Sequence, residues 1–481
     1  MKLNSKLGTS AVAAAVAIAC GGAYAATITA PSPATWSLQH NSKAKGGSTT
    51  TAAFDSTVRV VLGSDYIAND TVTLILDTAT SGAKFVTNTS TLTGASGYST
   101  NVTCANGSGN QLTLSFLSRD DSNANYRVSG TPGTPSGSTC NFTLPLLRST
   151  VATEGAAPKV SWSAKTAQSG LAFDTSSVVA TLGTVINQFP EGTVTAELDS
   201  VVDVDAGRYQ FVVDSTKNAA FGTSGRGDTL SFTLAEDTSA ETDALVSTIV
   251  TTVSGDFSFI DNNGTAGCQG GDLNTGHGRI SASGGTLTID SACSTLTFTA
   301  TTTGTKSITF GTQTDSTTPS NGQVIDAPQE FSMGAITYTW GAASNGSTGS
   351  TAADFEDNAA GEWTLNGSIS KISYMPYGTG ISRIIYITNR STQTGGVSAT
   401  AINDKGVECE IANVATATKG AVTILSTGLD AGVAACYGAD FNGKVAFEIT
   451  ANVPANKAEV YSAYNVNGNR VLVVNDTNGK N

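Results

Sequence analysis

Apolar and polar residues alternate along most of the chain, which is the pattern of β-strands that bury one face. Residues 71–76 (TVTLIL), 111–116 (QLTLSF) and 229–234 (TLSFTL) carry an apolar side chain at every second position. Turn-forming residues separate such segments, as in the sequences DNNG at 261–264 and NDKG at 403–406. The pattern predicts an all-β protein made of tandem antiparallel β-sandwich domains of the immunoglobulin-like (Ig-like) kind.

Helical periodicity is limited to two short segments. Glu241–Val253 spaces its apolar residues in a roughly helical way, although its threonine and valine content also suits a strand. Leu425–Ala435 is the second segment and leads into a cysteine. We therefore expect few helices, all of them short.

The first 25 residues have the three parts of a secretory signal peptide. Two lysines precede an apolar run at 11–19 that is too short to span a bilayer, and the sequence AYA at 23–25 forms a small-x-small cleavage site. Residues 1–25 are therefore predicted to be removed, so that the mature chain is secreted and begins at Ala26.

A lipoprotein is the alternative interpretation of the same segment. The sequence AIAC at 17–20 imitates a lipoprotein box, whose cleavage would leave Cys20 acylated as the N-terminal residue. Alanine stands three residues before this cysteine, where such a box favours leucine, so soluble secretion is the favoured interpretation.

Cleavage after residue 25 would remove Cys20 and leave six cysteines. An even number in a secreted chain is typical of disulfides in an oxidising compartment. Six cysteines allow fifteen pairings, so connectivity stays open. Sequential pairing is favoured because it places one crosslink in each third of the chain, each worth about 3–4 kcal/mol in the chain-entropy model. The favoured pairs are Cys104–Cys140, Cys268–Cys293 and Cys409–Cys436.

Length and composition predict three domains after the signal peptide. The first would cover residues 26–187 and the second residues 188–340. A stretch rich in Ser, Gly, Asn and Asp at 341–362 is typical of a linker, and a C-terminal β-sandwich would follow at 363–481.

The first two domains share a local pattern around their cysteines. The sequence RVS at 127–129 precedes Cys140 by 13 residues, and RIS at 279–281 precedes Cys293 by 14 residues. Two diverged copies of one sandwich, crosslinked at the same corner, would produce this pattern. The alternative is that any two threonine-rich strand regions look alike.

The charge balance excludes two classes of partner. Removing Lys2 and Lys6 with the signal peptide leaves 23 basic against 38 acidic side chains, a net charge of −15. This balance argues against binding to nucleic acid and against binding to anionic lipid, both of which need basic surfaces. Beyond the signal peptide no apolar run reaches membrane-spanning length, so we expect no transmembrane segment.

Catalytic motifs are scarce. His40 and His277 are the only histidines, and His277 lies between glycines in a predicted turn. The chain has no G-x-S-x-G elbow, no H-E-x-x-H zinc helix and no P-loop. Two carboxylates that converge only in the folded chain stay possible. The sequence indicates no catalytic residue, and we predict that the protein is not an enzyme.

Calcium is the ion that the sequence favours most. Asp199, Asp203 and Asp205 cluster ahead of Gly207, and oxygen-rich turns suit a hard cation. The spacing matches neither an EF-hand nor a nonapeptide repeat, so a solvated acidic turn is the favoured alternative.

An RGD tripeptide stands at residues 226–228, within a glycine-rich segment that is predicted to be a loop at 222–229. Such a tripeptide can act as a cell-adhesion signal. A match of three residues in a chain of this length is usually accidental, and that interpretation is favoured here.

The C-terminal region carries the most specific sequence. It contains SYMPYGTGISR at 373–383, the strand IIYITN at 384–389, TGGVSATA at 394–401 and EVYSAYNVNGNR at 459–470. These segments resemble the C-terminal part of Gram-negative surface-layer (S-layer) proteins of the A-layer type. The resemblance spans about residues 363–474. Over the first 360 residues it rests only on composition and on the alternating pattern of the strands.

The resemblance implies a secreted structural subunit that crosses the outer membrane and self-assembles into a two-dimensional lattice with copies of itself. It also implies that lipopolysaccharide holds this layer at the extracellular face of the outer membrane. Because neighbours with a net charge near −15 repel each other, we expect calcium to promote assembly.

A monomeric cell-surface adhesin or glycan-binding protein is the alternative function. Exposed aromatic residues such as Trp36 or Trp363 could then form a platform for a sugar ring, whereas burial in the core is the ordinary role of such residues.

Overall fold

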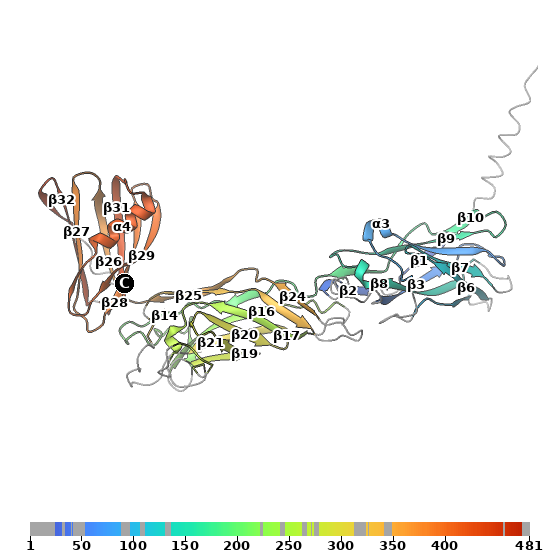
Figure 1. The fold of residues 1–481 in the computed structure, drawn as a ribbon, viewed down its shortest axis with the longest axis horizontal. Helices are drawn as coiled ribbons and strands as arrows, with labels where there is room; N and C mark the ends of the chain where they lie inside the picture. The colour runs from blue at the N-terminus through green and yellow to red at the C-terminus, as the bar shows by residue number, and fades with distance from the viewer. Residues whose placement is uncertain are drawn as a thin grey trace, which may run out of the picture. The chain divides into compact units, whose positions relative to one another are not determined.

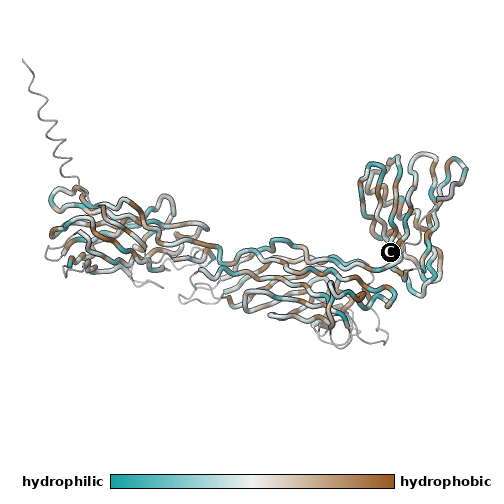
Figure 2. Tube along the Cα trace, turned by 180° about the vertical axis from the view of Figure 1, so that it is seen from behind, coloured by the Kyte–Doolittle hydropathy of each residue, from teal (hydrophilic) through white to brown (hydrophobic). Residues whose placement is uncertain are grey.

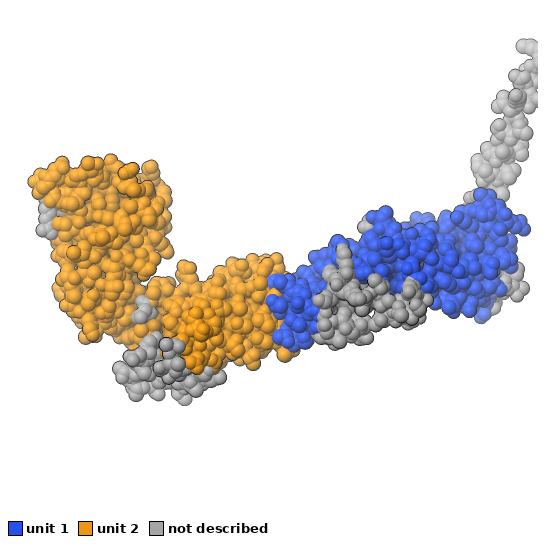
Figure 3. All heavy atoms as spheres, viewed as in Figure 1, with its two compact units in different colours: residues 1–190, 235–248, 337–353 blue, residues 191–234, 249–336, 354–481 orange. Residues whose placement is uncertain are grey.

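The structure is a computed structural model, and its chain forms two compact units. Unit 1 contains residues 1–190, 235–248 and 337–353, and unit 2 contains residues 191–234, 249–336 and 354–481 (Figure 3). The structure describes residues 25–30, 34–39, 41, 53–87, 97–105, 111–129, 136–221, 225–240, 246–261, 267–270, 272–273, 279–311, 324–325, 327–340, 349–455 and 457–473. The predicted signal peptide, except Ala25, and residues Cys20, His40 and His277 lie outside this part.

Unit 1 is built around one antiparallel sheet (Figure 1). The strands wholly or mostly in unit 1 are β1 (Thr27–Thr29), β2 (Ala34–Ser37), β3 (Ala53–Val61), β4 (Thr71–Leu76), β5 (Asn101–Ala105), β6 (Gln111–Arg119), β7 (Asn123–Val128), β8 (Thr139–Leu147), β9 (Lys159–Lys165), β10 (Ala172–Thr175), β11 (Ala180–Thr181), β12 (Gly183–Ile186), β23 (Ile336–Trp340) and β24 (Gly349–Ala353). The main sheet has the order β1-β3-β8-β5-β6-β7-β4-β9-β10, with β11 beside β9. Strand β12 pairs in parallel with β2, and β23 pairs with β24. A short helix α3 (Thr78–Ser81) and a 3-10 turn η1 (Arg148–Thr150) complete the unit.

The alternating pattern places the core of unit 1. Along β4 the side chains of Val72, Leu74 and Leu76 are buried, whereas their neighbours point outward or lie half-buried. Hydrophobic and hydrophilic residues accordingly alternate along the strands (Figure 2). The ring of Phe142 packs 5.1 Å from Tyr126 and 5.6 Å from Trp162, measured between centroids. The predicted β-rich sandwich class is confirmed.

The first sandwich of unit 2 consists of two sheets. Its strands are β13 (Thr193–Ala196), β14 (Val201–Val202), β15 (Ala219–Phe221), β16 (Gly225–Leu234), β17 (Val246–Ser254), β18 (Arg279–Ser283), β19 (Thr286–Ile289), β20 (Thr295–Ala300), β21 (Gly304–Gly311), β22 (Gln329–Met333) and β25 (Ala359–Leu365). One sheet has the order β13-β16-β21-β18, with β15 beside β16, and the other has the order β14-β25-β22-β17-β20-β19. A 3-10 turn η2 (Ser258–Ile260) follows β17.

Aromatic rings fill the space between these two sheets. The indole ring of Trp363 lies 4.8 Å from Phe331, 5.4 Å from Phe259 and 5.6 Å from Phe310, measured between centroids. Trp363 is fully buried and belongs to β25, so the strand that ends this sandwich is anchored at the centre of its core.

The second sandwich of unit 2 is formed by the C-terminal residues. Its strands are β26 (Ser368–Tyr377), β27 (Ile381–Asn389), β28 (Gly395–Asn403), β29 (Glu408–Ala417), β30 (Val422–Ile424), β31 (Gly443–Ala451), β32 (Ala458–Val466) and β33 (Asn469–Val473), and helix α4 covers Ser426–Tyr437. The two sheets have the orders β26-β31-β28-β29 and β30-β27-β32-β33.

Helix α4 is held against β29 by two glycines on one face. A Cβ atom on Gly428 would collide with the carbonyl oxygen of Val414, and one on Gly432 would collide with the side chain of Ile411. The helix buries Leu429 and Val433 in the C-terminal core. The helix predicted at 425–435 is therefore confirmed.

Glu241–Val253, whose sequence suited both a helix and a strand, forms β17 from Val246 onward, because its β-branched residues alternate between two faces and the inward ones are buried. One local prediction is wrong. The RGD segment was predicted to be a loop, but Gly225–Leu234 forms the strand β16.

The predicted domain boundaries stay a prediction. The two units do not coincide with the three predicted domains. Within the predicted linker at 341–362, the structure describes residues 349–362, which include β24 and the start of β25. Strand β24 has no fully buried face, whereas β25 buries Ala360, Trp363 and Leu365.

Candidate functional site

The structure pairs the six cysteines sequentially, which is the pairing favoured from the sequence. Cys104–Cys140 joins the neighbouring strands β5 and β8, Cys268–Cys293 joins two loops, and Cys409–Cys436 joins β29 to the end of α4. The first two crosslinks thus differ in kind, one between strands and one between loops. The expectation of two copies crosslinked at the same corner is not met.

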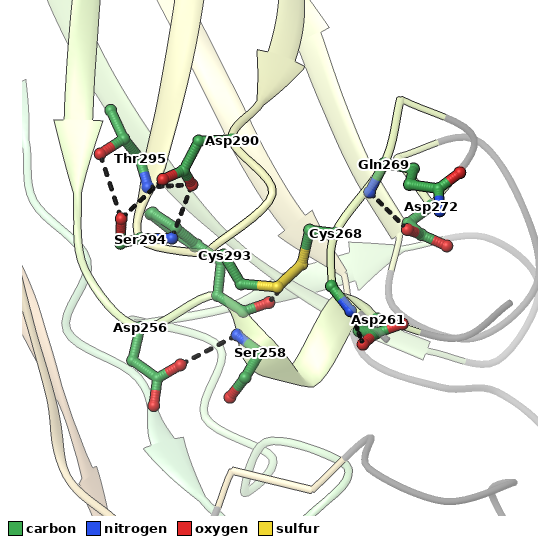
Figure 4. The surroundings of a disulfide bond; sticks show 12 residues. Asp256, Ser258, Asp261, Cys268, Gln269, Asp272, Asp290, Cys293, Ser294 and Thr295 are labelled. Atoms are coloured by element: carbon green, nitrogen blue, oxygen red, sulfur yellow. Dashed lines mark hydrogen bonds between the residues drawn. A yellow bond between two sulfur atoms is a disulfide. The ribbon is translucent and has the colours of Figure 1, made fainter. Parts of the chain in front are cut away.

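Aspartates organise the loops around Cys268–Cys293 (Figure 4). Asp290 accepts backbone hydrogen bonds from Ser294 at 2.7 Å and Thr295 at 2.9 Å. Hydrogen bonds, chiefly from Ser294, hold the pKa of Asp290 below its usual value. Asp272 accepts a hydrogen bond from the backbone N–H of Gln269 at 2.7 Å. Acidic residues in this region therefore act as side-chain caps of turns.

The same role falls to one of the predicted calcium ligands. Asp203 Oδ1 accepts hydrogen bonds from the backbone N–H groups of Asp205 at 3.0 Å and Ala206 at 3.2 Å, and from Asn366 Nδ2 at 3.3 Å. The side chain of Asp199 is half-exposed, with a carboxylate oxygen 3.9 Å from Lys217 Nζ. Within the described ranges, no group of three or more His, Cys, Asp or Glu residues is arranged to hold a metal ion. Calcium binding stays a prediction.

The aspartate of the RGD segment is a buried centre of unit 2. Asp228 is 1% exposed, and its Oδ2 accepts hydrogen bonds from the backbone N–H of Asp199 and of Ser200, each at 3.0 Å, and from Trp363 Nε1 at 2.7 Å. Burial raises the pKa of this carboxyl group. The carboxylate thus fixes β16, the segment before β14, and β25, and it is not presented to a receptor.

A second polar cluster, which we call the Arg208 joint, links the two sandwiches of unit 2. Arg208 is 8% exposed and has a φ of 68°, and its Nη2 donates to the carbonyl oxygen of Thr394 at 2.8 Å. Gln393 Nε2 donates to the carbonyl oxygen of Val204 at 3.1 Å. The loop of residues 203–208 therefore contacts the C-terminal sandwich through hydrogen bonds from both sides.

The chain connection beside this joint is short. Strand β25 ends at Leu365 and β26 begins at Ser368, so only Asn366 and Gly367 connect the two sandwiches. Asn366 Oδ1 accepts a hydrogen bond from the backbone N–H of Val204 at 2.6 Å. A Cβ atom on Gly367 would collide with the carbonyl oxygen of Ala451. The connection is therefore pinned on both sides and has little room to move.

A groove of about 630 Å³ lies next to the joint, between β22 and β25 on one side and β28 and β29 on the other. Glu330 and Glu362 lie directly opposite each other on β22 and β25, and Glu410 lines the groove from β29. Like charges in facing positions of a sheet repel each other. The groove is thus an acidic surface within unit 2.

The two tryptophans considered as a sugar platform are in the core. Trp36 and Trp363 are both 0% exposed, so the interpretation of these residues as an exposed platform is wrong.

None of the helices in the described ranges combines the length and the apolar character needed to cross a membrane.

Sequence reasoning missed the role of Asp228, although a signal was present. The residue shares the two-residue period of Leu230, Phe232 and Leu234, which are all buried, so the pattern already put Asp228 on the inward face. The Arg208 joint had no comparable signal, because its donors and acceptors come from residues up to 244 positions apart.

These features belong to a chain built from crosslinked sandwiches, a common class of extracellular proteins. A family model described as "S-layer protein Slr4" matches residues 70–470. The chain therefore belongs to this family of surface-layer proteins, which makes it an extracellular cell-surface protein. The match covers far more than the C-terminal region singled out by sequence resemblance. No curated protein matches the chain.

Among solved structures, a variant of the major pilin subunit BcpA of Bacillus cereus is 8% identical, with a TM-score of 0.21, and the match covers 80% of this chain and 91% of the pilin. CfaE, the adhesive subunit of CFA/I fimbria of enterotoxigenic Escherichia coli, is 10% identical, with a TM-score of 0.20. This match covers 70% of this chain and 99% of CfaE. Likenesses this weak carry no argument about function.

Proposed function

We propose that the protein is a structural subunit that self-assembles into a paracrystalline surface layer on a Gram-negative cell. The family match over residues 70–470 is the observation that carries the proposal. A subunit of this kind works through contacts with copies of itself, so its units must keep their shape. The three disulfides and the pinned connection at Asn366 support that requirement.

The finer parts of the proposal follow the A-layer resemblance. The signal peptide at 1–25 directs the chain to secretion, and lipopolysaccharide holds the assembled layer at the outer face of the outer membrane. The protein performs no catalysis. No observation favours the alternative of a monomeric adhesin or glycan-binding protein, since the residues considered for its platform are buried.

Electron microscopy of whole cells tests the lattice. Cells that produce the protein should show a periodic envelope pattern, and cells with the gene deleted should lose it. A smooth envelope on cells with abundant protein at their surface would overturn the proposal.

A second experiment tests the anchor. Cells of the same strain that lack the outer part of lipopolysaccharide should shed ordered sheets into the medium. Retention of the layer on those cells would contradict the proposed anchor alone.

Calcium is proposed to promote assembly because copies with a net charge of −15 repel each other at the short distances of a lattice. Purified protein should form ordered sheets in millimolar calcium and stay dispersed in excess chelator. Magnesium and a monovalent salt of equal ionic strength serve as controls for screening. Equally ordered sheets in chelator would contradict the role of calcium and leave the lattice itself intact.

A further inference from the structure

Unit 1 contains a buried carboxylate that binds the start of the first strand. Asp174 is 0% exposed, and its Oδ1 accepts a hydrogen bond from the backbone nitrogen of Ala26 at 2.9 Å. Its Oδ2 accepts hydrogen bonds from the backbone N–H of Gly63 at 3.0 Å and from the hydroxyl group of Tyr66 at 2.6 Å. Among the described residues, no lysine or arginine forms an ion pair with Asp174.

The position of this contact in the sheet gives it a structural role. Strands β1 and β10 stand at the two ends of the strand order, and Ala26 directly precedes β1 while Asp174 lies in β10. The hydrogen bond between Ala26 and Asp174 therefore joins the two edges of one sheet. Edges left open expose unpaired backbone groups, and this contact satisfies one of them, the N–H of Ala26.

The same contact coincides with the predicted processing site. Ala25 is exposed, whereas Ala26 is 1% exposed and packs with Ile28 in the core of unit 1. The predicted cleavage falls between these two residues. Hydrolysis of the peptide bond consumes one water molecule and leaves a carboxylate on Ala25 and an amine on Ala26, which takes up a proton at neutral pH.

We propose that the α-ammonium group released at Ala26 binds the carboxylate of Asp174 as a buried ion pair, so that removal of the signal peptide locks the sheet of unit 1. In the precursor the donor at this position is a neutral amide N–H. In the mature chain it is a cation, and a charge-assisted hydrogen bond is about twice as strong as a neutral one. Because Ala25 is exposed, its departure leaves water access for the remaining N–H groups of the ammonium.

The proposal goes beyond the lattice function and rests on the predicted cleavage after Ala25. The intact mass of the mature protein tests that cleavage directly. A chain that begins at Ala26 is expected. A mature chain that begins at any other residue, including a lipid-modified Cys20, would overturn the proposal.

Three forms of the oxidised full chain then test the ion pair. One begins at Ala26, one begins at Ala25, and one begins at Ala26 with an acetylated α-amine, which keeps an N–H donor but has no charge. Thermal unfolding is followed by the fluorescence of Trp162, which donates to the Tyr66 hydroxyl at 3.3 Å, together with the other tryptophans. The first form should have a Tm higher than the other two by about 2–4 °C. Equal Tm values for the three forms would overturn the proposal.

Two variants separate the charge from the local packing. In Asp174→Asn the Tm should fall, and the difference between the free and the acetylated N-terminus should vanish. Tyr66→Phe removes another donor to the same carboxylate, and in this variant the difference should persist. If Asp174→Asn does not fold, the Tm values of the three N-terminal forms in the Tyr66→Phe background still decide whether the ion pair forms.

A Tm difference between the free and the acetylated N-terminus that survives Asp174→Asn unchanged would contradict the assignment of Asp174 as the partner. Lattice formation plays no part in these measurements, so their failure is distinguishable from failure of the proposed function.

Discussion

Each of the two units contains a buried aspartate at the point where a distant segment joins a sheet. The carboxylate accepts hydrogen bonds from that segment in both units, but the nature of the donors differs. Asp174 in unit 1 accepts two backbone hydrogen bonds and one from Tyr66, and Asp228 in unit 2 accepts three backbone hydrogen bonds and one from Trp363. The donors to Asp228 are all neutral and belong to the interior of the chain. One donor to Asp174 lies at the predicted cleavage site. The proposed ion pair would therefore make unit 1, but not Asp228 in unit 2, sensitive to cleavage of the chain.

The largest effect is expected from Asp228→Ala. The change leaves the indole N–H of Trp363 and two backbone N–H groups buried without an acceptor, and it should lower the free energy of unfolding of unit 2 by about 3–5 kcal/mol. Urea unfolding measures this loss of stability, and hydrogen exchange in β16 and β25 shows where it occurs. Asp205→Ala, an exposed aspartate of the same region, serves as the control and should change stability by less than about 0.5 kcal/mol. Equal effects of the two variants would show that Asp228 is not a structural centre.

Loss of a disulfide should come next. The double variant Cys104→Ala/Cys140→Ala opens a loop with a sequence separation of 36 residues, and it should lower the stability of unit 1 by about 3–4 kcal/mol. Cys268→Ala/Cys293→Ala should act on unit 2 instead. Hydrogen exchange resolved by peptide separates the two. A loss of protection that spreads equally over both units would refute the view that each unit is stabilised separately.

The aromatic donors give a matched pair of smaller effects. Tyr66→Phe and Trp363→Phe each remove one hydrogen bond to a buried carboxylate, and each should lower the free energy of unfolding of its own unit by about 1.5–3 kcal/mol. Trp363→Phe should be the more damaging of the two, because it also reduces the ring that contacts Phe331, Phe259 and Phe310. Chemical denaturation measures both, and the opposite order would mean that packing around Trp363 is loose.

The smallest expected effect is a pH dependence in unit 2. Because burial raises the pKa of Asp228, the folded chain holds this proton more tightly than the unfolded chain does. Stability should therefore fall as the pH rises from the unfolded pKa near 3.9 through the folded pKa. Asp228→Asn should remove this part of the slope in a series of thermal melts. An unchanged slope would show that other carboxyl groups cause the pH dependence of stability.

Local patterns predicted most strands and one helix, because a two-residue period and a helical period are visible in the sequence. Glu241–Val253 was ambiguous because its apolar residues are spaced in a roughly helical way while its threonines and valines suit a strand, and pairing in the sheet decided between the two. The cysteine pairing followed from simple proximity in sequence. In each of these cases the information is local.

The contacts of Asp174 and Arg208 could not be predicted in the same way. The partners of Asp174 include Ala26, 148 residues away, and those of Arg208 include Asn452, 244 residues away. No periodicity records such a contact. The acidic cluster near Gly207 did not reveal that Asp203 caps a turn, because a cap depends on backbone geometry that composition does not record.

The three crosslinks have a mechanical consequence for a chain pulled from its two ends. Each disulfide closes a segment within a single unit, with sequence separations of 36, 25 and 27 residues. A segment of 36 residues would otherwise lengthen by about 120 Å when fully drawn out. Under tension these segments stay folded back on themselves, so a sheet that begins to tear can lengthen only through the chain that lies outside the loops.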